Sequence, residues 1–181
     1  MKVLLMGHPN VGKSAVFNRL TGANVIESNY PGTTVDYTKG YMRIKGEDIT
    51  VVDVPGTFSL EPKDKAEEVA VKMLEEEEEG TVVICVIDSS KIERGLYLAL
   101  EIMERGYPVM LALNMWDVAE DKNIDIDVEK LRKIFGIPVI PTVAISGEGI
   151  GELVKKIKET RPVEVDKIIK KVGGIDGTNR R

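Results

Sequence analysis

The sequence predicts a three-layer α/β fold: a mostly parallel six-stranded sheet, covered by helices on both faces, with one antiparallel edge strand. Short apolar runs of strand length alternate with longer stretches in which apolar residues recur at helical spacing. This alternation is typical of parallel sheets whose crossover connections are helices. The 181 residues suit a single domain, since domains usually hold about 100–200 residues.

Six apolar runs define the predicted strands. They lie near residues 2–6, 37–44, 49–54, 81–87, 108–113 and 138–142. The second and third runs are separated only by Lys45-Gly-Glu-Asp48, a link short enough for a β-hairpin. One strand of that pair must therefore run antiparallel to the rest, and we expect it at the edge of the sheet.

Five stretches show helical periodicity, near residues 13–21, 63–78, 92–105, 127–135 and 149–160. In the second stretch apolar residues from Ala66 to Leu74 recur at i, i+3, i+4, i+7 and i+8, which gives one apolar face. The pattern weakens after about Arg161. We therefore expect one domain over 1–160, followed by a short helical or disordered tail over 161–181 or the start of a further helical region.

Composition excludes several classes of protein. The formal net charge of −5 argues against a general nucleic-acid binder, which usually has a basic surface. A single cysteine, Cys85, sits in an apolar run and cannot form an internal disulfide, and one histidine cannot build a zinc cluster. No apolar stretch reaches the ~18 residues of a membrane span, so this stretch of chain is expected to be soluble and cytoplasmic.

Residues Gly7-His-Pro-Asn-Val-Gly-Lys-Ser14 fit G-x-x-x-x-G-K-[ST] between a predicted strand and a predicted helix. The glycines let the backbone curl so that N–H groups and the helix N-terminus converge on phosphate oxygens. Lys13 would contact the β- and γ-phosphates, and Ser14 would bind Mg²⁺. The residues expected to contact a nucleoside triphosphate here are His8, Pro9, Asn10, Val11, Gly12, Lys13, Ser14 and Ala15.

The segment Asn114-Met-Trp-Asp117 follows a predicted strand and fits the N-K-x-D pattern of guanine recognition. A carboxylate only accepts hydrogen bonds, so Asp117 suits guanine, whose N1–H and N2–H₂ both donate; the N1 atom of adenine is an acceptor. Met115 stands where the pattern has Lys and removes a charged stem from the base. We therefore predict a GTP/GDP site with loosened nucleotide binding.

A second base-contacting loop is predicted at Val143-Ala-Ile-Ser-Gly-Glu-Gly149, which aligns with S-A-x-x-G-x-G. Here the Ala144 backbone N–H would meet O6 of guanine. Val143 replaces the usual Ser, which favours a mobile loop. A plain strand-to-helix turn is the alternative interpretation.

Two further segments are expected to respond to the γ-phosphate. Asp53-Val-Pro-Gly56 fits D-x-x-G, in which Asp53 holds Mg²⁺ through water and the Gly56 N–H contacts the γ-phosphate. The polar segment 28–34 offers a hydroxyl for Mg²⁺, and we favour Thr34 over Thr33. Loops 24–36 and 55–63 are thus predicted to be nucleotide-dependent switches.

The sequence predicts slow intrinsic hydrolysis of GTP. Thr57 stands where many GTPases carry a water-orienting Gln, and its side chain is too short for that role. His8 is interpreted as a solvent-facing loop residue rather than a catalytic one. Arg94 is interpreted as a helix-surface charge rather than an arginine finger, because it is not expected to lie beside a phosphate motif.

Over about residues 1–160 the chain resembles the GTPase domain of the ferrous iron transport protein B family. The phrases that carry the resemblance are Gly7-x-Pro-Asn-x-Gly-Lys-Ser14, Asn29-Tyr-Pro-Gly-Thr-Thr-Val35, Asp53-Val-Pro-Gly-Thr-Phe-Ser-Leu60, Glu93-Arg-Gly-Leu-Tyr-Leu98 and Leu113-Asn-Met-Trp-Asp-Val118. The chain departs from the family phrases at His8, Phe58 and Gly95, none of which is assigned to Mg²⁺ or to the base.

This resemblance implies a GTPase domain on the cytoplasmic face of the cell membrane, with a transmembrane iron-permease region of the same polypeptide as its partner. It also implies that Asn10 coordinates K⁺ beside the phosphates; a turn residue chosen for its conformation is the alternative. The expected catalytic set is Lys13, Asn10, Thr34 and Gly56. Copies could associate through this domain, and no nucleic-acid partner is expected.

Two competing functions remain open at this point. One is a free-standing GTPase in RNA or ribosome maturation. Such GTPases share the phosphate loop and a similar P-G-T-T motif, but they need a basic RNA-binding extension. The other is a nucleotide-binding scaffold without useful hydrolysis, suggested by Thr57.

Overall fold

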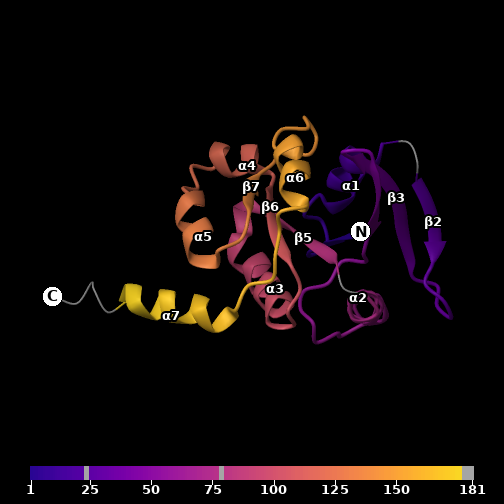
Figure 1. The fold of residues 1–181 in the computed structure, drawn as a ribbon, viewed down its shortest axis with the longest axis horizontal. Coiled ribbons are helices and arrows are strands. Elements are labelled where there is room, and N and C mark those ends of the chain that lie inside the picture. Colours follow the sequence, from indigo (N-terminus) through magenta and orange to yellow (C-terminus); the bar gives the residue numbers. More distant parts are fainter. Residues whose placement is uncertain (23–24, 78–79, 177–181) are drawn as a thin grey trace.

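In a computed structural model that describes residues 1–22, 25–77 and 80–176, the chain forms a seven-stranded sheet between two layers of helices (Figure 1). The strands are β1 Lys2–Met6, β2 Val25–Asn29, β3 Asp36–Ile44, β4 Glu47–Asp53, β5 Thr81–Asp88, β6 Val109–Asn114 and β7 Val139–Pro141. The helices are α1 Lys13–Thr21, α2 Lys65–Glu75, α3 Ile92–Glu104, α4 Trp116–Asp121, α5 Val128–Phe135, α6 Ile150–Ile157 and α7 Val165–Asp176, with a short 3₁₀ turn at Ser89–Lys91.

The strand order is β2-β3-β4-β1-β5-β6-β7. β1 pairs in parallel with β4 and β5, and β6 pairs in parallel with β5 and β7. β3 is antiparallel to both β2 and β4. The mostly parallel α/β sheet is therefore confirmed, and it places the carboxyl ends of β1, β4 and β6 along one edge, where α/β proteins bind ligands.

The count of six strands was wrong by one. The extra strand, β2, lies in segment 24–36, which was predicted to be a loop, and residues 23–24 lie outside the described residues. Its five residues are mostly exposed because β2 is the outermost strand, so it lacks the apolar run of a buried strand. The predicted hairpin is confirmed between β3 and β4, with Lys45 and Gly46 at φ 51° and 82° in its turn. β3, however, is not the edge strand.

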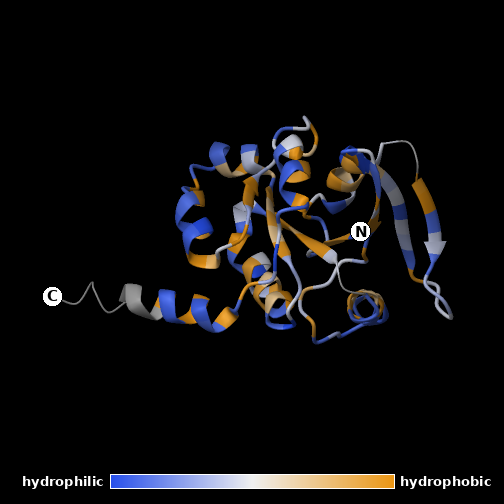
Figure 2. Cartoon of the chain, in the orientation of Figure 1, coloured by the Kyte–Doolittle hydropathy of each residue, from blue (hydrophilic) through white to orange (hydrophobic). Residues whose placement is uncertain are grey.

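Alternate residues of each buried strand supply two separate cores, as the pleat of a strand requires. Val3 and Leu5 of β1 face α1 and α6, whereas Leu4 and Met6 face the layer that contains α2 and α3. Figure 2 shows the hydrophobic central strands enclosed by helices whose outer faces are hydrophilic. The parallel strands are thus buried on both faces, and their carboxyl ends form a rigid platform.

Helix boundaries differ modestly from the predictions. α2 begins after Asp64, whose carboxylate accepts a hydrogen bond from the Glu67 N–H (2.9 Å), and ends at Glu75, within the predicted 63–78; residues 78–79 lie outside the described residues. The six-residue α4 was not predicted. In the tail, α7 packs on the core through Ile168. No helix in the described ranges is long and apolar enough to cross a membrane.

Candidate nucleotide-binding site

The phosphate loop connects β1 to α1, as the sequence predicted. Gly12 has φ 83°, and a Cβ on it would lie 2.3 Å from Nδ2 of Asn114, so both the backbone and the neighbouring side chain require glycine. α1 begins after Gly12 with no side-chain cap. The N–H groups of its first turn, at Lys13, Ser14 and Ala15, are therefore available to an anionic ligand.

Asp53 links this loop to the end of β4. It is 8% exposed; its Oδ1 accepts a hydrogen bond from Lys13 Nζ and its Oδ2 accepts one from Ser14 Oγ at 2.7 Å. Ser14 and Asp53, two of the three side chains predicted to bind Mg²⁺, are thus hydrogen-bonded to each other. A hydroxyl and a carboxylate beside a phosphate-binding helix terminus are the hard oxygen donors that Mg²⁺ prefers, so the residues present fit this ion.

The D-x-x-G segment lies directly against the phosphate loop. The Thr57 N–H donates to the Gly7 carbonyl at 3.1 Å, and a Cβ on Gly56 would lie only 3.0 Å from Cγ of Pro9. The Thr57 side chain is fully buried, and its hydroxyl donates to the Ser59 carbonyl at 2.7 Å. The Thr57 hydroxyl is therefore engaged within its own loop, and whether Thr57 can orient a water stays a prediction.

A functional residue that sequence reasoning missed is Glu67, which is 4% exposed at the start of α2. Its carboxylate accepts hydrogen bonds from the backbone N–H groups of Phe58 (3.0 Å) and Lys63 (2.7 Å). One side chain therefore fixes both ends of loop 58–63. The spacing Asp64-x-x-Glu67 is a capping-box pattern, and it was the available signal that Glu67 returns to the backbone before the helix.

His8 and Phe58 form a contact on the outer side of the phosphate loop. Their ring centroids are 4.9 Å apart, and His8 Nε2 lies 3.2 Å from the Phe58 carbonyl oxygen. Burial lowers the pKa of His8, with a smaller contribution in the same direction from Arg94. His8 is therefore half-buried rather than solvent-facing as predicted.

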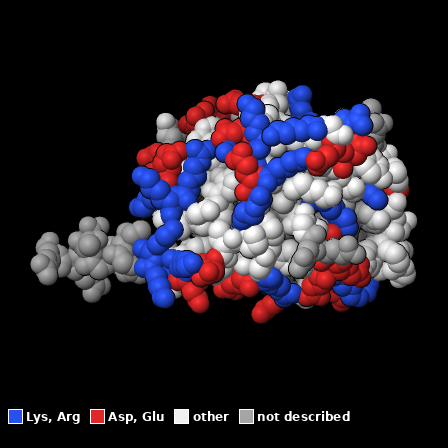
Figure 3. Space-filling model, viewed as in Figure 1, with Lys and Arg blue, Asp and Glu red and all other residues white. Residues whose placement is uncertain are grey.

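Arg94 is exposed on α3, as the sequence interpretation had it, but it also lies beside the phosphate loop. It lines a pocket of about 210 Å³ together with Lys91, Phe58 and the phosphate-loop residues His8 to Val11. The argument that Arg94 is remote from a phosphate motif was therefore wrong, because the turn after β5 brings α3 alongside the loop. On the face of the molecule shown in Figure 3, basic and acidic side chains are interspersed.

Asn114, at the end of β6, joins the phosphate loop to the predicted base loop. Its Nδ2 donates to the Val11 carbonyl at 2.9 Å. Its Oδ1 accepts from the Ala144 N–H at 3.0 Å and from Thr142 Oγ1 at 3.3 Å. The residue is 3% exposed, so this network is shielded from water and holds three segments in a fixed arrangement.

This network changes the expected role of Ala144. Its N–H, predicted to meet O6 of guanine, donates to Asn114 instead. Val143 closes the base loop, residues 143–149, by donating to the Glu148 carbonyl at 3.1 Å. Met115 has φ 56° and its methyl group lies over Gly12, whereas Asp117 is exposed in the first turn of α4.

The segment predicted as the first switch loop is a closed turn between β2 and β3. The Thr33 hydroxyl donates to the Tyr30 carbonyl (2.9 Å) and accepts from the Val35 N–H (3.1 Å), whereas the Thr34 side chain is exposed. The preference for Thr34 over Thr33 as an Mg²⁺ ligand stays a prediction. Among the described residues, Thr34 makes no hydrogen bond to Ser14 or Asp53.

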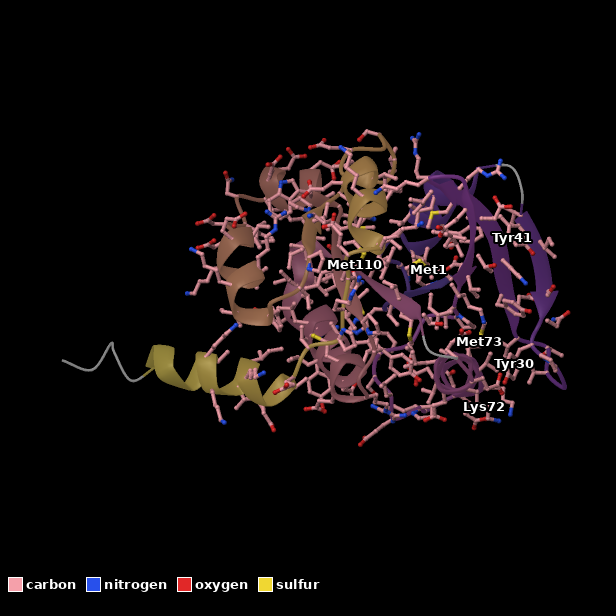
Figure 4. All side chains as sticks on the ribbon, viewed as in Figure 1. Met1, Tyr30, Tyr41, Lys72, Met73 and Met110 are labelled. Atoms are coloured by element: carbon pink, nitrogen blue, oxygen red, sulfur yellow. The ribbon has the colours of Figure 1, made fainter. Side chains whose placement is uncertain are left out.

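A tyrosine attaches this turn to α2. The Tyr30 hydroxyl donates to Oε1 of Glu76 at 2.5 Å, and Figure 4 shows Tyr30 beside Met73 at the end of that helix. The hydrogen bond to Glu76 raises the pKa of Tyr30 to about 12. Segment 24–36 is thus partly strand and partly anchored turn, rather than the open loop that was predicted.

The architecture and the site together define a P-loop GTP-binding domain of the small-GTPase type. A family model described as ferrous iron transport protein B matches residues 1–157. The chain belongs to this ferrous iron transport protein B (FeoB) family.

Relatives and solved structures agree with this assignment. The chain is 41% identical over 153 residues to an Fe(2+) transport protein A/Fe(2+) transporter FeoB fusion protein of Porphyromonas gingivalis, covering 84% of this chain and 18% of that protein. It is 38% identical over 151 residues to the Fe(2+) transporter FeoB of Leptospira biflexa, covering 83% and 22%. The chain therefore spans about a fifth of the length of these relatives.

Among solved structures, the GDP form II of the cytosolic domain of T. maritima FeoB matches with a TM-score of 0.83 and 42% identity, covering 88% of this chain and 62% of that one. The GMPPNP form of the same domain matches with a TM-score of 0.84 and 38% identity, covering 100% and 76%. The family therefore includes domains solved with guanine nucleotides.

Proposed function

We propose that this domain binds GTP with Mg²⁺, hydrolyses it slowly to GDP and phosphate, and through this cycle regulates Fe²⁺ uptake by a membrane region of the same polypeptide. The observation that carries the proposal is the buried Asn114 network. It holds the phosphate loop at Val11 and the base loop at Ala144 in one arrangement, as recognition of both ends of one nucleotide requires. Membership of the FeoB family supports iron transport rather than RNA maturation as the context.

In this proposal the chain's own groups bind the phosphates. Lys13 exchanges its bond to Asp53 for the β- and γ-phosphate oxygens, since a compact ammonium group is a strong phosphate ligand. The uncapped first turn of α1 supplies N–H groups of Lys13, Ser14 and Ala15. Ser14 and Asp53 hold Mg²⁺, which when bound neutralises charge that develops on the phosphate oxygens.

The two switch segments are proposed to close over the γ-phosphate. The Gly56 N–H, which already lies against Pro9 of the phosphate loop, donates to it. Thr34, exposed at the tip of the β2–β3 turn, reaches the ion once the Tyr30 anchor on Glu76 is released. Because Thr57 is buried and bonded to Ser59, it does not replace the missing Gln, and slow intrinsic turnover is expected.

Asn10 is proposed to coordinate K⁺ beside the phosphates. It lies exposed in the phosphate loop with φ 65°, a conformation that Asn tolerates better than most residues. GTP turnover measured in K⁺ and in Na⁺ buffers tests this role. Faster turnover in K⁺ that Asn10→Ala removes is expected, and equal rates in the two buffers would overturn it.

Single-turnover hydrolysis tests the GTPase assignment. With Mg²⁺ the chain should convert GTP but not ATP, and Lys13→Ala should reduce the rate by at least a hundredfold. Asp117→Asn should move the preference from GTP to xanthosine triphosphate, because an amide can donate to the additional carbonyl of xanthine. Asp121→Asn, at the other end of α4, is the matched control and should leave GTP preferred. Turnover of ATP and GTP at equal rates would contradict the proposal.

We further propose that residues 1–160 form the GTPase unit, that the domain works at the cytoplasmic face of the cell membrane, and that copies associate through it.

The full-length protein, expressed in cells that lack Fe²⁺ uptake, tests the regulatory role. Uptake of radioactive iron should be restored by the wild type and lost with Lys13→Ala at equal expression. Restoration by both proteins would separate transport from nucleotide binding and would contradict the role.

A further inference from the structure

One arginine, in the second half of α1, binds backbone carbonyl groups of the base loop. Arg19 donates from Nε to the Ala144 carbonyl at 2.8 Å and from Nη2 to the Ile145 carbonyl. A Cβ on Gly147 would lie 3.6 Å from its Nη1, so the guanidinium lies along the loop. The helix that starts at the phosphate loop therefore also reaches the base loop.

Within residues 143–149, all of which the structure describes, two backbone N–H groups have no hydrogen-bond partner, those of Ile145 and Gly149. The N–H groups of Ser146 and Gly147 both donate to the Val143 carbonyl (3.1 and 2.9 Å), and that of Ala144 donates to Asn114. Gly149 leads directly into α6, whereas Ile145 follows Ala144 and its side chain is 84% exposed. The free donor next to the one predicted is therefore the Ile145 N–H.

Arg19 controls the direction of this donor through peptide geometry. The Ala144 carbonyl and the Ile145 N–H belong to the same planar trans peptide and point in opposite directions. A guanidinium that holds this carbonyl therefore turns the Ile145 N–H away from α1. The second bond, to the Ile145 carbonyl, fixes the next peptide as well. Only the forked arrangement of arginine donors spans two successive carbonyls; lysine offers a single point charge.

We infer that Arg19 is a positioning residue for base selection, which presents the Ile145 N–H to an oxygen at position 6 of a purine. The inference rests on the proposed function, since it requires a purine nucleotide at this site. It assigns the reading of O6 to the base loop and leaves N1–H and the 2-amino group to Asp117. The usual Ser at position 143 has a hydroxyl that could hold the loop, but Val143 has none. Arg19 supplies a constraint on the loop in its place.

Three diphosphates separate this role from a general structural one. GDP carries O6, N1–H and the 2-amino group, inosine diphosphate keeps O6 and N1–H, and 2-aminopurine riboside diphosphate keeps the amino group but lacks both O6 and N1–H. With Arg19→Ala, GDP and inosine diphosphate should dissociate about tenfold faster in stopped-flow measurements, the change expected for one lost hydrogen bond. Dissociation of the 2-aminopurine compound should stay within twofold of its wild-type rate. Equal acceleration of all three, or of none, would overturn the inference.

Two further variants keep the experiment decisive. Arg19→Lys retains the charge and much of the stem, and should give the same selective pattern with a smaller change, so it replaces Arg19→Ala if that variant does not fold. Arg43→Ala removes an exposed arginine that pairs with Asp48 in the β3–β4 hairpin and should change none of the three rates. A wild-type chain that binds ADP as tightly as GDP would instead overturn the proposed function itself.

Discussion

The two sides of the phosphate loop are held in different ways. On the base side, the buried amide of Asn114 connects Val11, Thr142 and Ala144. On the side of the predicted switch loops, carboxylates at the two ends of α2 anchor the chain: Glu76 accepts from the Tyr30 hydroxyl, and Glu67 accepts from the Phe58 N–H. The base side is thus held by one buried amide that joins three segments, whereas the predicted switch loops are held by two separate carboxylates, Glu67 buried and Glu76 exposed.

Asn114→Ala should break the hydrogen-bond network on the base side, and of the variants considered it should lower the free energy of unfolding most. It leaves the Val11 carbonyl and the Ala144 N–H without their partner in a buried place, so the free energy of unfolding should fall by about 3 kcal/mol. Urea unfolding measures the loss. Asn18→Ala, on the exposed face of α1, is the control and should change it by less than about 0.5 kcal/mol. Equal losses for the two variants would contradict the comparison.

Glu67→Ala should loosen the switch side by releasing two N–H groups. A loss of about 2 kcal/mol in unfolding free energy is expected, together with faster amide exchange at Phe58 and Lys63. Glu67→Gln keeps an acceptor and should lose less. The neighbouring Glu68 pairs with Lys65 on the surface, so Glu68→Ala should leave both amides protected. Unchanged exchange at Phe58 and Lys63 in Glu67→Ala would show that the loop is held elsewhere.

Tyr30→Phe should free the β2–β3 turn without affecting the core. The folded pKa of Tyr30, about 12, is above the ordinary 10.0. Its hydroxyl therefore stabilises the fold below pH 10, and this contribution is lost as the pH rises from 10 towards 12. Ultraviolet titration should show a late-titrating tyrosine that the variant lacks, and exchange should accelerate within 30–35. A titration identical to that of the wild type would contradict the anchor.

His8→Asn should have the smallest effect, visible only in acid. The folded pKa of His8 is below its ordinary value of 6.5, so the unfolded chain binds a proton first. Its contribution to stability is present above pH 6.5 and is lost as the pH falls below that value. Since His8 is the only histidine, the variant should flatten the decline in unfolding free energy between pH 7.5 and 5.5. An unchanged decline would argue against the half-buried position.

Local patterns predicted much of this molecule. The phosphate loop, the parallel strands and the β3–β4 hairpin follow from periodicity and from short motifs, which depend on neighbours in the sequence. β2 was missed because an exposed edge strand has no apolar run. The partner of the Ala144 N–H and the bond from Arg19 to that loop were also missed. These contacts join residues 30 and 125 positions apart, so packing rather than local pattern determines them.

The order of strands in the sheet has a consequence for how the chain folds. β2, β3 and β4 are consecutive both in sequence and in the sheet, whereas β1 lies between β4 and β5. The meander can form by closing short loops, but the placement of β1 requires partners from far along the chain, and distant contacts form slowly. We therefore expect the segment that carries the predicted first switch to fold early, and the phosphate loop to acquire its shape only when the central strands assemble.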